Sequence, residues 1–230
     1  MAQVEADAYT FPHKGEMASD NTAVVVIDMQ VDFLGPGGWA DMAGVDLDRM
    51  RSIIPAQQRI LDAARKAGMM VVYTREGHRP SGRDLTSVKQ FRSRLGGAGV
   101  GDRAPIGRIL TRGEPGWEII PELAPEPGDP IIDKVGSGCF YGTETEHLLR
   151  RSGIDNLIFV GVTTECCVHT SLREASDRGF DNLLVEDACA ATTPELQDAA
   201  VMIVRNPNTL FGTVSTVDRL LQSMSGLPPA

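Results

Sequence analysis

Short β-branched runs alternate along the chain with segments of helical periodicity, and this alternation is the strongest constraint on the fold. The first run, TAVVVIDM at residues 22–29, is almost continuously apolar, as expected for a strand that helices cover on both faces. Strand and helix patterns that alternate in this way are typical of βαβ units. The sequence therefore predicts an α/β fold, a doubly wound and mainly parallel sheet with helices on both faces.

The same patterns place the other elements. We expect a helix over residues 48–67, which Pro55 bends or divides and Gly68 ends. Further strands are expected at residues 69–74, 130–133, 156–160 and 182–186, further helices at 143–151, 167–178 and 194–204, and a last strand and helix within 210–224. Thr143 and Glu146 have the spacing of a capping box, which favours a helix start there.

A single domain over residues 1–230 accounts for these elements, with a long loop insert at about 77–129. The insert is rich in Gly, Pro and Arg and has only weak periodicity. Loops of this length in a compact domain are usually functional or mobile. The glycines at positions 96, 97, 99 and 101 do not match G-x-G-x-x-G and do not lie between a strand and a helix, which argues against a dinucleotide site.

Charge and hydropathy exclude several classes of protein. The 230 residues include 22 Lys and Arg and 31 Asp and Glu, for a net charge of −9 at pH 7. An acidic surface of this kind repels nucleic acid and anionic membranes, so neither is an expected partner. The apolar runs are far too short to span a membrane, and the first residues have no hydrophobic region typical of a secretory signal. We expect a cytoplasmic protein.

Three reactive side chains follow predicted strands. Asp28 ends the first strand, Lys134 ends the strand IID, and Cys167 opens the helix after NLIFVGV. Because ligands in open α/β sheets bind outside the carboxyl ends of the strands, these side chains should converge on one crevice. A buried acid and a buried ammonium are each costly alone, so Asp28 and Lys134 are expected to pair. Taken one at a time, Asp28 and Lys134 could be an inert buried ion pair and Cys167 a packed thiol. The placement of all three at strand ends favours a functional site.

Three motifs carry a family resemblance. The strings VVVIDMQVDF, IIDKVGSGCF and GVTTECCVHTSLREASDRGF resemble the isochorismatase-like cysteine hydrolases, in the same order and over about residues 20–220. The resemblance implies that Asp28, Lys134 and Cys167 form the catalytic triad. The nucleophile of that family lies six residues after the first glycine of the third motif, which selects Cys167 and makes Cys166 a dispensable neighbour. It also implies a cis peptide before Thr163 and a homo-oligomer, often a tetramer.

The chemistry of these residues fits hydrolysis of an amide. Cys167 beside a helix N-terminus and Lys134 is expected to have a lowered pKa, which favours the thiolate nucleophile. Asp28 would accept the thiol proton and later protonate the leaving nitrogen. The N–H groups of Thr163 and Cys167 would form the oxyanion hole, and water would hydrolyse the thioester.

No metal or other cofactor is expected. The nicotinamidases of the same superfamily carry an Asp-x-His motif with further histidines. In this chain only Glu76-Gly-His78 resembles that motif. His147 is far along the chain on a predicted helix, and two possible ligands do not make a zinc site.

The insert favours a ureide as the small-molecule substrate. TREGHRP and GRILTRGEPGWEIIPEL resemble the biuret hydrolase branch, whose substrates carry a terminal carbamoyl amide. Biuret hydrolases have a lysine and a glutamine where this chain has Ser137 and Pro207, so we expect a roomier pocket and triuret as substrate, giving carboxybiuret and ammonia. Biuret, giving allophanate and ammonia, is the alternative.

Other interpretations stay open. The chain could be a nicotinamidase or an N-carbamoyl amino acid amidase, a non-catalytic binding member of the fold, or a thiol redox sensor that uses Cys166 and Cys167. The candidate substrate-binding residues are Phe33, Glu76, Ser137, Tyr141 and Asn208.

Overall fold

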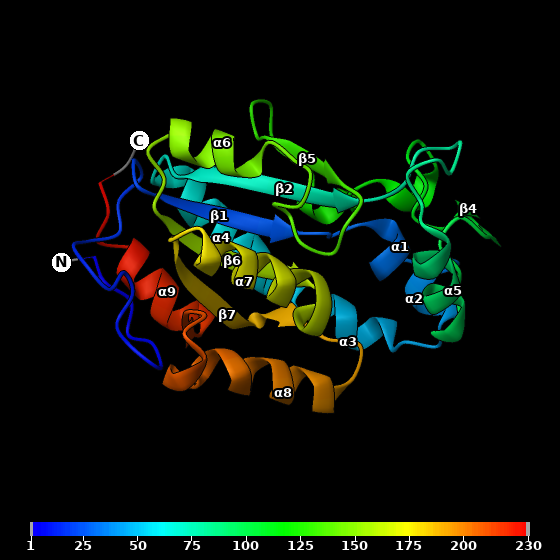
Figure 1. The fold of residues 1–230 in the computed structure, drawn as a ribbon. Coiled ribbons are helices and arrows are strands. Elements are labelled where there is room, and N and C mark those ends of the chain that lie inside the picture. Colours follow the sequence, from blue (N-terminus) through cyan, green and yellow to red (C-terminus); the bar gives the residue numbers. More distant parts are fainter. Residues whose placement is uncertain (1, 229–230) are drawn as a thin grey trace.

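A parallel sheet forms the centre of the protein (Figure 1). The computed structural model describes residues 2–228, and within them six strands lie in the order β5-β2-β1-β6-β7-β8, with every neighbouring pair parallel. The strands are β1 (Thr22–Ile27), β2 (Met70–Glu76), β5 (Ile131–Lys134), β6 (Asn156–Val162), β7 (Asp181–Ala190) and β8 (Thr213–Ser215). The predicted fold class is confirmed.

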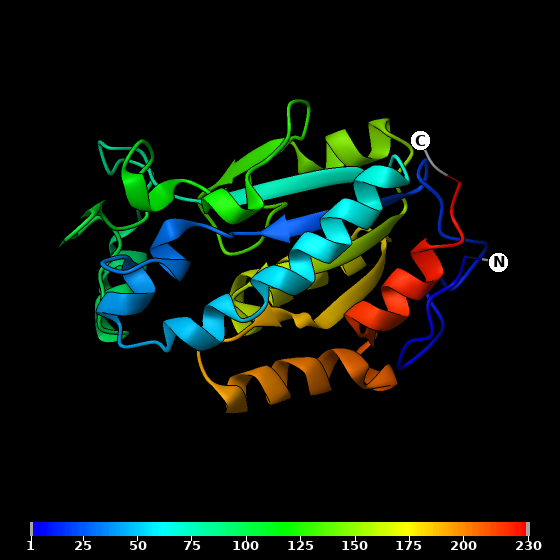
Figure 2. The same cartoon turned by 180° about the vertical axis from the view of Figure 1, so that it is seen from behind.

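Helices cover both faces of this sheet. Figure 1 shows α6 (Thr145–Arg151) and α7 (His169–Asp177) in front of the strands, while Figure 2 shows α4 (Ile54–Lys66) and α9 (Val217–Met224) on the opposite face. Another helix, α8 (Pro194–Arg205), packs on the same face as α6 and α7 through Val201 and Val204.

Alternate side chains of β1 supply the two cores. Val24 and Val26 belong to the core on the α4 side, and Ala23, Val25 and Ile27 belong to the core on the α7 side. Successive residues of a strand point to opposite faces, so a run of small branched side chains fills both layers at once. This explains why the first strand reads as continuously apolar.

The boundaries differ from the predictions where local geometry decides. The helix expected over 48–67 is two helices, α3 (Leu47–Arg51) and α4, with Pro55 in the first turn of α4, where a missing N–H is tolerated. The capping box is wrong, because Glu144 is the N-cap of α6 and the Thr143 hydroxyl donates to the carbonyl of Cys139. The helix expected from residue 167 is preceded by a π-helical turn over Thr164–Val168, which contains Cys167.

The insert lies beyond the carboxyl ends of β1 and β2, at the right of Figure 1. It holds α5 (Ser87–Leu95), a small hairpin of β3 (Arg103–Ala104) and β4 (Gly107–Arg108), and two short 3₁₀ turns, Pro115–Trp117 and Pro121–Leu123. The short helices α1 (Val31–Leu34) and α2 (Trp39–Met42) follow β1 at the same end. The Asp32 carboxylate accepts the N–H of Leu110 at 2.7 Å and so ties the insert to α1.

The strand order determines where a ligand can bind. The chain runs outward from β1 through β2 to β5, then returns to the other side of β1 with β6 and continues to β7 and β8. The switch in direction therefore lies between β1 and β6. At such a point the connecting segments diverge to opposite faces and leave a crevice at the carboxyl ends of the strands.

None of the helices within residues 2–228 is both long enough and apolar enough to cross a membrane.

Gly161 permits the close approach of β1 and β6 at this switch. It has φ of +124°, and a Cβ added there would lie 2.1 Å from the carbonyl oxygen of Ile27. We expect Gly161→Ala to lower the free energy of unfolding by more than about 3 kcal/mol, because the backbone must leave its positive φ and β1 must move away from the new Cβ. Urea denaturation measures the loss. Gly226→Ala is the matched control, since its Cβ would meet no atom closer than 3.6 Å; equal loss in both variants would contradict the explanation.

Candidate active site

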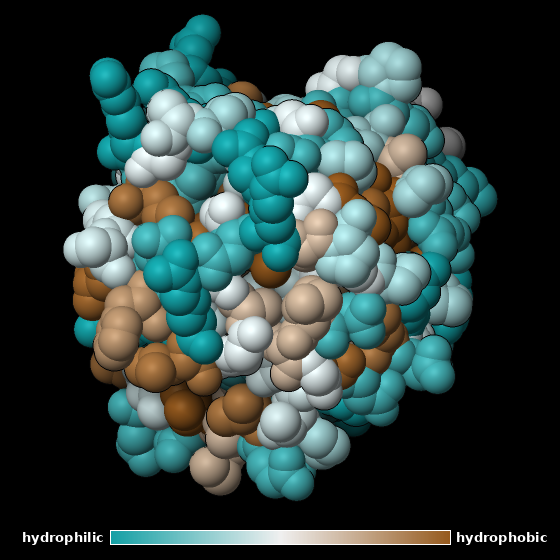
Figure 3. All heavy atoms as spheres, turned by 90° about the vertical axis from the view of Figure 1, so that its right-hand side faces the viewer, coloured by the Kyte–Doolittle hydropathy of each residue, from teal (hydrophilic) through white to brown (hydrophobic). Residues whose placement is uncertain are grey.

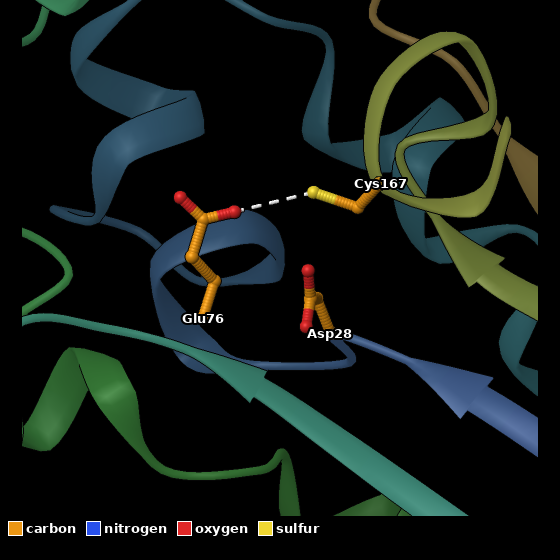
Figure 4. A group of neighbouring side chains, drawn as sticks. All are labelled: Asp28, Glu76 and Cys167. Carbon is orange, nitrogen blue, oxygen red and sulfur yellow. Dashed lines mark hydrogen bonds between the residues drawn. The ribbon is translucent and has the colours of Figure 1, made fainter. Parts of the chain in front are cut away.

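Four neighbouring strands each deliver one ionisable side chain to the switch point. Asp28 directly follows β1, Glu76 ends β2, Lys134 ends β5, and Cys167 lies in the turn after β6. All four residues are buried. Figure 4 shows Asp28, Glu76 and Cys167 pointing toward one another from three separate elements. The convergence expected of Asp28, Lys134 and Cys167 is therefore present, with Glu76 as a fourth member.

Lys134 lies between the two carboxylates. Its ammonium is 2.7 Å from Asp28 Oδ2 and 3.3 Å from Glu76 Oε2, and it donates to the carbonyl of Gly136 at 3.0 Å. The side chains of Lys134 and Asp28 are fully buried. An ammonium without water needs several oxygen partners to offset its lost hydration, and these three atoms provide them.

Asp28 is held by its neighbour on β2. The Thr74 hydroxyl donates to Asp28 Oδ1 at 2.6 Å and accepts the N–H of Asp28 at 3.1 Å. Asp28 itself has φ of +48°, a region that few residues other than glycine adopt. These contacts fix one carboxylate oxygen on Thr74 and leave the other facing Lys134.

Glu76 is held from three directions. Its Oε1 accepts from Lys89 Nζ at 2.6 Å, and its Oε2 accepts from Cys167 Sγ at 3.2 Å. The amide of Gln30 accepts the backbone N–H of Glu76 at 2.7 Å, donates to its carbonyl at 3.0 Å, and also donates to the carbonyl of Trp117. Around Glu76, the formal charges of two carboxylates are matched by those of two ammoniums.

The two carboxylates differ in basicity. Burial raises the pKa of Asp28, and this outweighs Lys134, which lowers it. Burial also acts to raise the pKa of Glu76, but Lys134 and Lys89 together lower it to about 2. Asp28 is therefore the stronger base of the pair, although Glu76 holds the hydrogen bond from the thiol.

The two adjacent thiols also differ. The hydrogen bond with Cys166, burial and the carboxylates of Asp28 and Glu76 raise the pKa of Cys167 well above its usual value, against the opposing effect of Lys134. The lowered pKa expected for Cys167 is therefore wrong, because the hydrogen bond with Cys166 and burial of the thiol outweigh the lowering effect of Lys134. The hydrogen bond with Cys167 lowers the pKa of the exposed Cys166 thiol to about 7.

A cavity of about 560 Å³ opens onto the site. Five of the residues expected in the site line it, namely Phe33, Glu76, Ser137, Thr163 and Cys167. The peptide between Val162 and Thr163 is cis, as the resemblance implied. Phe33 forms an aromatic wall with Trp39, with ring centroids 5.5 Å apart in an edge-to-face arrangement.

Two expected substrate-binding residues lie elsewhere. Tyr141 is 66% exposed and does not line the cavity. Asn208 lies in a turn before β8, at the amino end of the sheet, where Pro207 borders a different hollow beside Tyr9 and Phe180. Residues that precede a parallel strand emerge at the end opposite the site, so neither Pro207 nor Asn208 reaches this cavity within the chain.

Sequence reasoning missed Lys89, Arg92, Gln30 and Trp39. Lys89, Arg92 and Trp39 line the cavity, and Gln30 supports Glu76 from behind. Lys89 is one of four lysines in the chain, which was the available signal. It lies in an insert without clear periodicity, so the sequence did not predict the helix that carries it or the direction of its side chain.

Oxygen and sulfur atoms of Asp28, Glu76 and Cys167 lie within 4.8 Å of one another, a spacing that could suit a metal ion. The Lys134 ammonium already contacts both carboxylates, however, and would repel a second cation. His78 does not join this group, because its ring Nδ1 lies 3.2 Å from the carbonyl of Asp84, and His147 is exposed on α6. The residues present fit an ammonium better than a zinc ion.

We expect iodoacetamide near neutral pH to modify Cys166 before Cys167, because the thiolate is the reactive form and only Cys166 has a pKa of about 7. The rate at Cys166 should rise with pH through that value. Fragment-ion mass spectrometry of the tryptic peptide distinguishes the adjacent positions. Cys139, whose pKa burial raises to about 12, is the internal control and should stay unmodified; faster labelling of Cys167 would contradict the assignment.

Known proteins resemble this chain over most of its length. A model of the isochorismatase domain matches residues 22–219. The ureidoacrylate amidohydrolase RutB of Azorhizobium caulinodans is 32% identical over 232 residues, covering 95% of this chain and 96% of that protein. RutB of Stutzerimonas stutzeri is 31% identical over 230 residues, covering 94% of this chain and 88% of the relative.

Solved structures share the fold of this chain. A cysteine hydrolase from Pseudomonas syringae pv. phaseolicola superposes with a TM-score of 0.78 at 27% identity, covering 94% of this chain and 97% of that one. The N-carbamoylsarcosine amidase of Thermoplasma acidophilum superposes with a TM-score of 0.65 at 26% identity, covering 86% and 97%. On its sequence motifs, sheet order and relatives, this chain belongs to the isochorismatase family.

Proposed function

We propose that this protein is an amidohydrolase that cleaves the terminal carbamoyl C–N bond of a small ureide through a thioester on Cys167, with triuret as the substrate. The observation that carries the proposal is the buried Cys167 thiol, which lines a cavity and faces two carboxylates and an ammonium. A nucleophile beside a base that a third group orients is the arrangement that acyl transfer requires.

Asp28 is the general base in this proposal. A carboxylate with a raised pKa accepts a proton more readily than one whose pKa is about 2, so Asp28 is better suited than Glu76. Lys134 opposes the effect of burial on the pKa of Asp28 and so favours the ionised form that accepts the thiol proton. Because the resting thiol is protonated, the nucleophile forms only as it attacks a bound carbonyl, which protects the free enzyme from unwanted acylation.

The reaction then proceeds in two halves. Cys167 Sγ bonds to the terminal carbonyl carbon while its proton moves to Asp28, and the N–H groups of Thr163 and Cys167 hold the oxyanion. The C–N bond breaks, and Asp28 returns the proton to the nitrogen, which leaves as ammonia. Water attacks the thioester, giving its proton to Asp28; the C–S bond breaks, the carboxylated ureide leaves, and the proton returns to sulfur.

A ureide suits the rest of the cavity. Glu76 offers acceptor oxygens for the N–H groups of a carbamoyl end, and the Phe33–Trp39 wall suits a planar molecule. The N-carbamoylsarcosine amidase and the ureidoacrylate amidohydrolases among the relatives are named for such substrates. Triuret rather than biuret rests on Ser137, which lines the cavity where the resemblance implies a lysine in biuret hydrolases. Pro207, being outside the cavity, no longer supports the longer ureide.

The test is ammonia release from triuret, biuret, nicotinamide and N-carbamoylsarcosine. We expect turnover of triuret to exceed that of biuret, and Cys167→Ala to reduce it at least about 1,000-fold because the nucleophile is lost. Cys166→Ala is the matched control and should keep activity within about tenfold of wild type. Preference for biuret would overturn the argument from Ser137, and an active Cys167→Ala variant would overturn the thioester.

A ureido acid is the second candidate, and Arg92 favours it. Arg92 is an exposed residue in the lining of the cavity and forms no ion pair with any of residues 2–228. Glu165 also lines the cavity, but its Oε1 accepts from Thr192 and it forms no ion pair with Arg92. A cation without an ion-pair partner in this lining would suit a substrate carboxylate. Ureidoacrylate, for which the relatives are named, has this chemistry.

Arg92→Gln separates the two candidates. For a ureido acid we expect KM to rise about 10- to 100-fold, because a charge-assisted hydrogen bond is lost. For triuret, which is neutral, KM should change by less than about threefold. Steady-state kinetics on triuret and 3-ureidoacrylate give both values, and a large effect on triuret alone would contradict the role assigned to Arg92.

A further inference from the structure

The helix α5 covers the cavity without burying a side chain. None of its residues is buried, and its apolar side chains Val88, Phe91 and Leu95 are 49%, 61% and 72% exposed. Figure 3 views the end of the molecule where α5 lies, and brown apolar side chains show at its surface there. Apolar packing, which holds most amphipathic helices in place, contributes little here.

Lys89 connects α5 to the sheet. Its ammonium donates to Glu76 Oε1 at the end of β2 and to the carbonyl of Val135 after β5, both at 2.6 Å. Within residues 2–228 the other long-range side-chain hydrogen bonds of α5 reach only positions 100 and 102, which belong to the insert itself. The lysine is therefore the polar link between this helix and the catalytic strands.

The same contact sets the charge around Glu76. The groups that face this carboxylate are Lys134 from β5, Asp28 after β1, Cys166 and Cys167 in the turn after β6, His78 after β2, and Lys89 from α5. His78 is neutral in this setting because burial and Lys89 lower its pKa. Without Lys89, two carboxylates would share one ammonium and the site would carry a net negative charge.

We propose that Lys89 is a positioning residue that holds α5 over the cavity and keeps Glu76 ionised, with its second oxygen turned to Cys167. The position of α5 and the charge of the site are then coupled, because movement of α5 away from the cavity would also remove the Lys89 ammonium from Glu76. The part that concerns turnover rests on the proposed function, whereas the part that concerns α5 does not.

The test compares Lys89→Met, Lys89→Arg and Lys66→Met. Lys66 is exposed on α4, outside the site, and controls for loss of a lysine. In Lys89→Met we expect amide hydrogen exchange of residues 87–95 to increase at least about tenfold in the free protein, because the tie to the sheet is lost. Lys66→Met should exchange as wild type does in this segment.

Activity gives the second readout. The proposed base is Asp28, whose pKa the neighbouring Glu76 carboxylate already acts to raise. Without Lys89 the negative charge of Glu76 is less compensated, so the pKa of Asp28 rises further and the acidic limb of kcat/KM should move up by about 1 pH unit in Lys89→Met. The charge-conserving Lys89→Arg should bring the limb back toward its wild-type position. A merely structural role would lower activity without moving the limb.

Two results would overturn the proposal. Unchanged exchange of residues 87–95 in Lys89→Met would show that α5 is held by other contacts, and an unmoved acidic limb would show that Lys89 does not act on Glu76. If the wild-type protein hydrolyses none of the ureides, the proposed function fails, and hydrogen exchange alone decides whether Lys89 holds the helix.

Discussion

The site depends on one buried ammonium. Lys134 has a fully buried side chain and is stable there only because Asp28, Glu76 and a backbone carbonyl surround it. In return it holds two carboxylates close together that would otherwise repel each other or take up protons. Geometry and protonation are thus fixed by the same contacts, and the thiol of Cys167 enters an arrangement whose charges are already balanced.

The sheet order makes this arrangement possible. β5, β2, β1 and β6 are consecutive neighbours, so residues from distant parts of the chain end side by side at one edge. Gly161 lets β6 approach β1 closely enough for the turn that carries Cys167 to meet Asp28. The strand ends therefore provide the reactive groups, and the insert, α1, α2 and the segments that follow β6 and β7 provide the walls of the cavity.

Sequence reasoning succeeded where a strand's end determines a residue's place. Asp28, Lys134 and Cys167 could be brought together because parallel strands end at a common edge. It failed where distance along the chain misleads: Asn208 is close to the last strand but precedes it, and so lies at the opposite end. The pKa of Cys167 was misjudged because the pattern showed one nearby cation but not the hydrogen bond with Cys166 or the burial of the thiol. Lys89 was missed because its place depends on how an aperiodic insert folds back.

Gln30 shows that the insert and the catalytic strands are not independent modules. Its buried amide bonds the backbone of Glu76 on one side and the carbonyl of Trp117 on the other. A single side chain thus aligns the last residue of β2 with a turn of the insert some forty positions later in the chain. An exchange of inserts between relatives, made to alter the substrate, would therefore have to preserve that carbonyl, or the carboxylate beneath the cavity would lose its alignment.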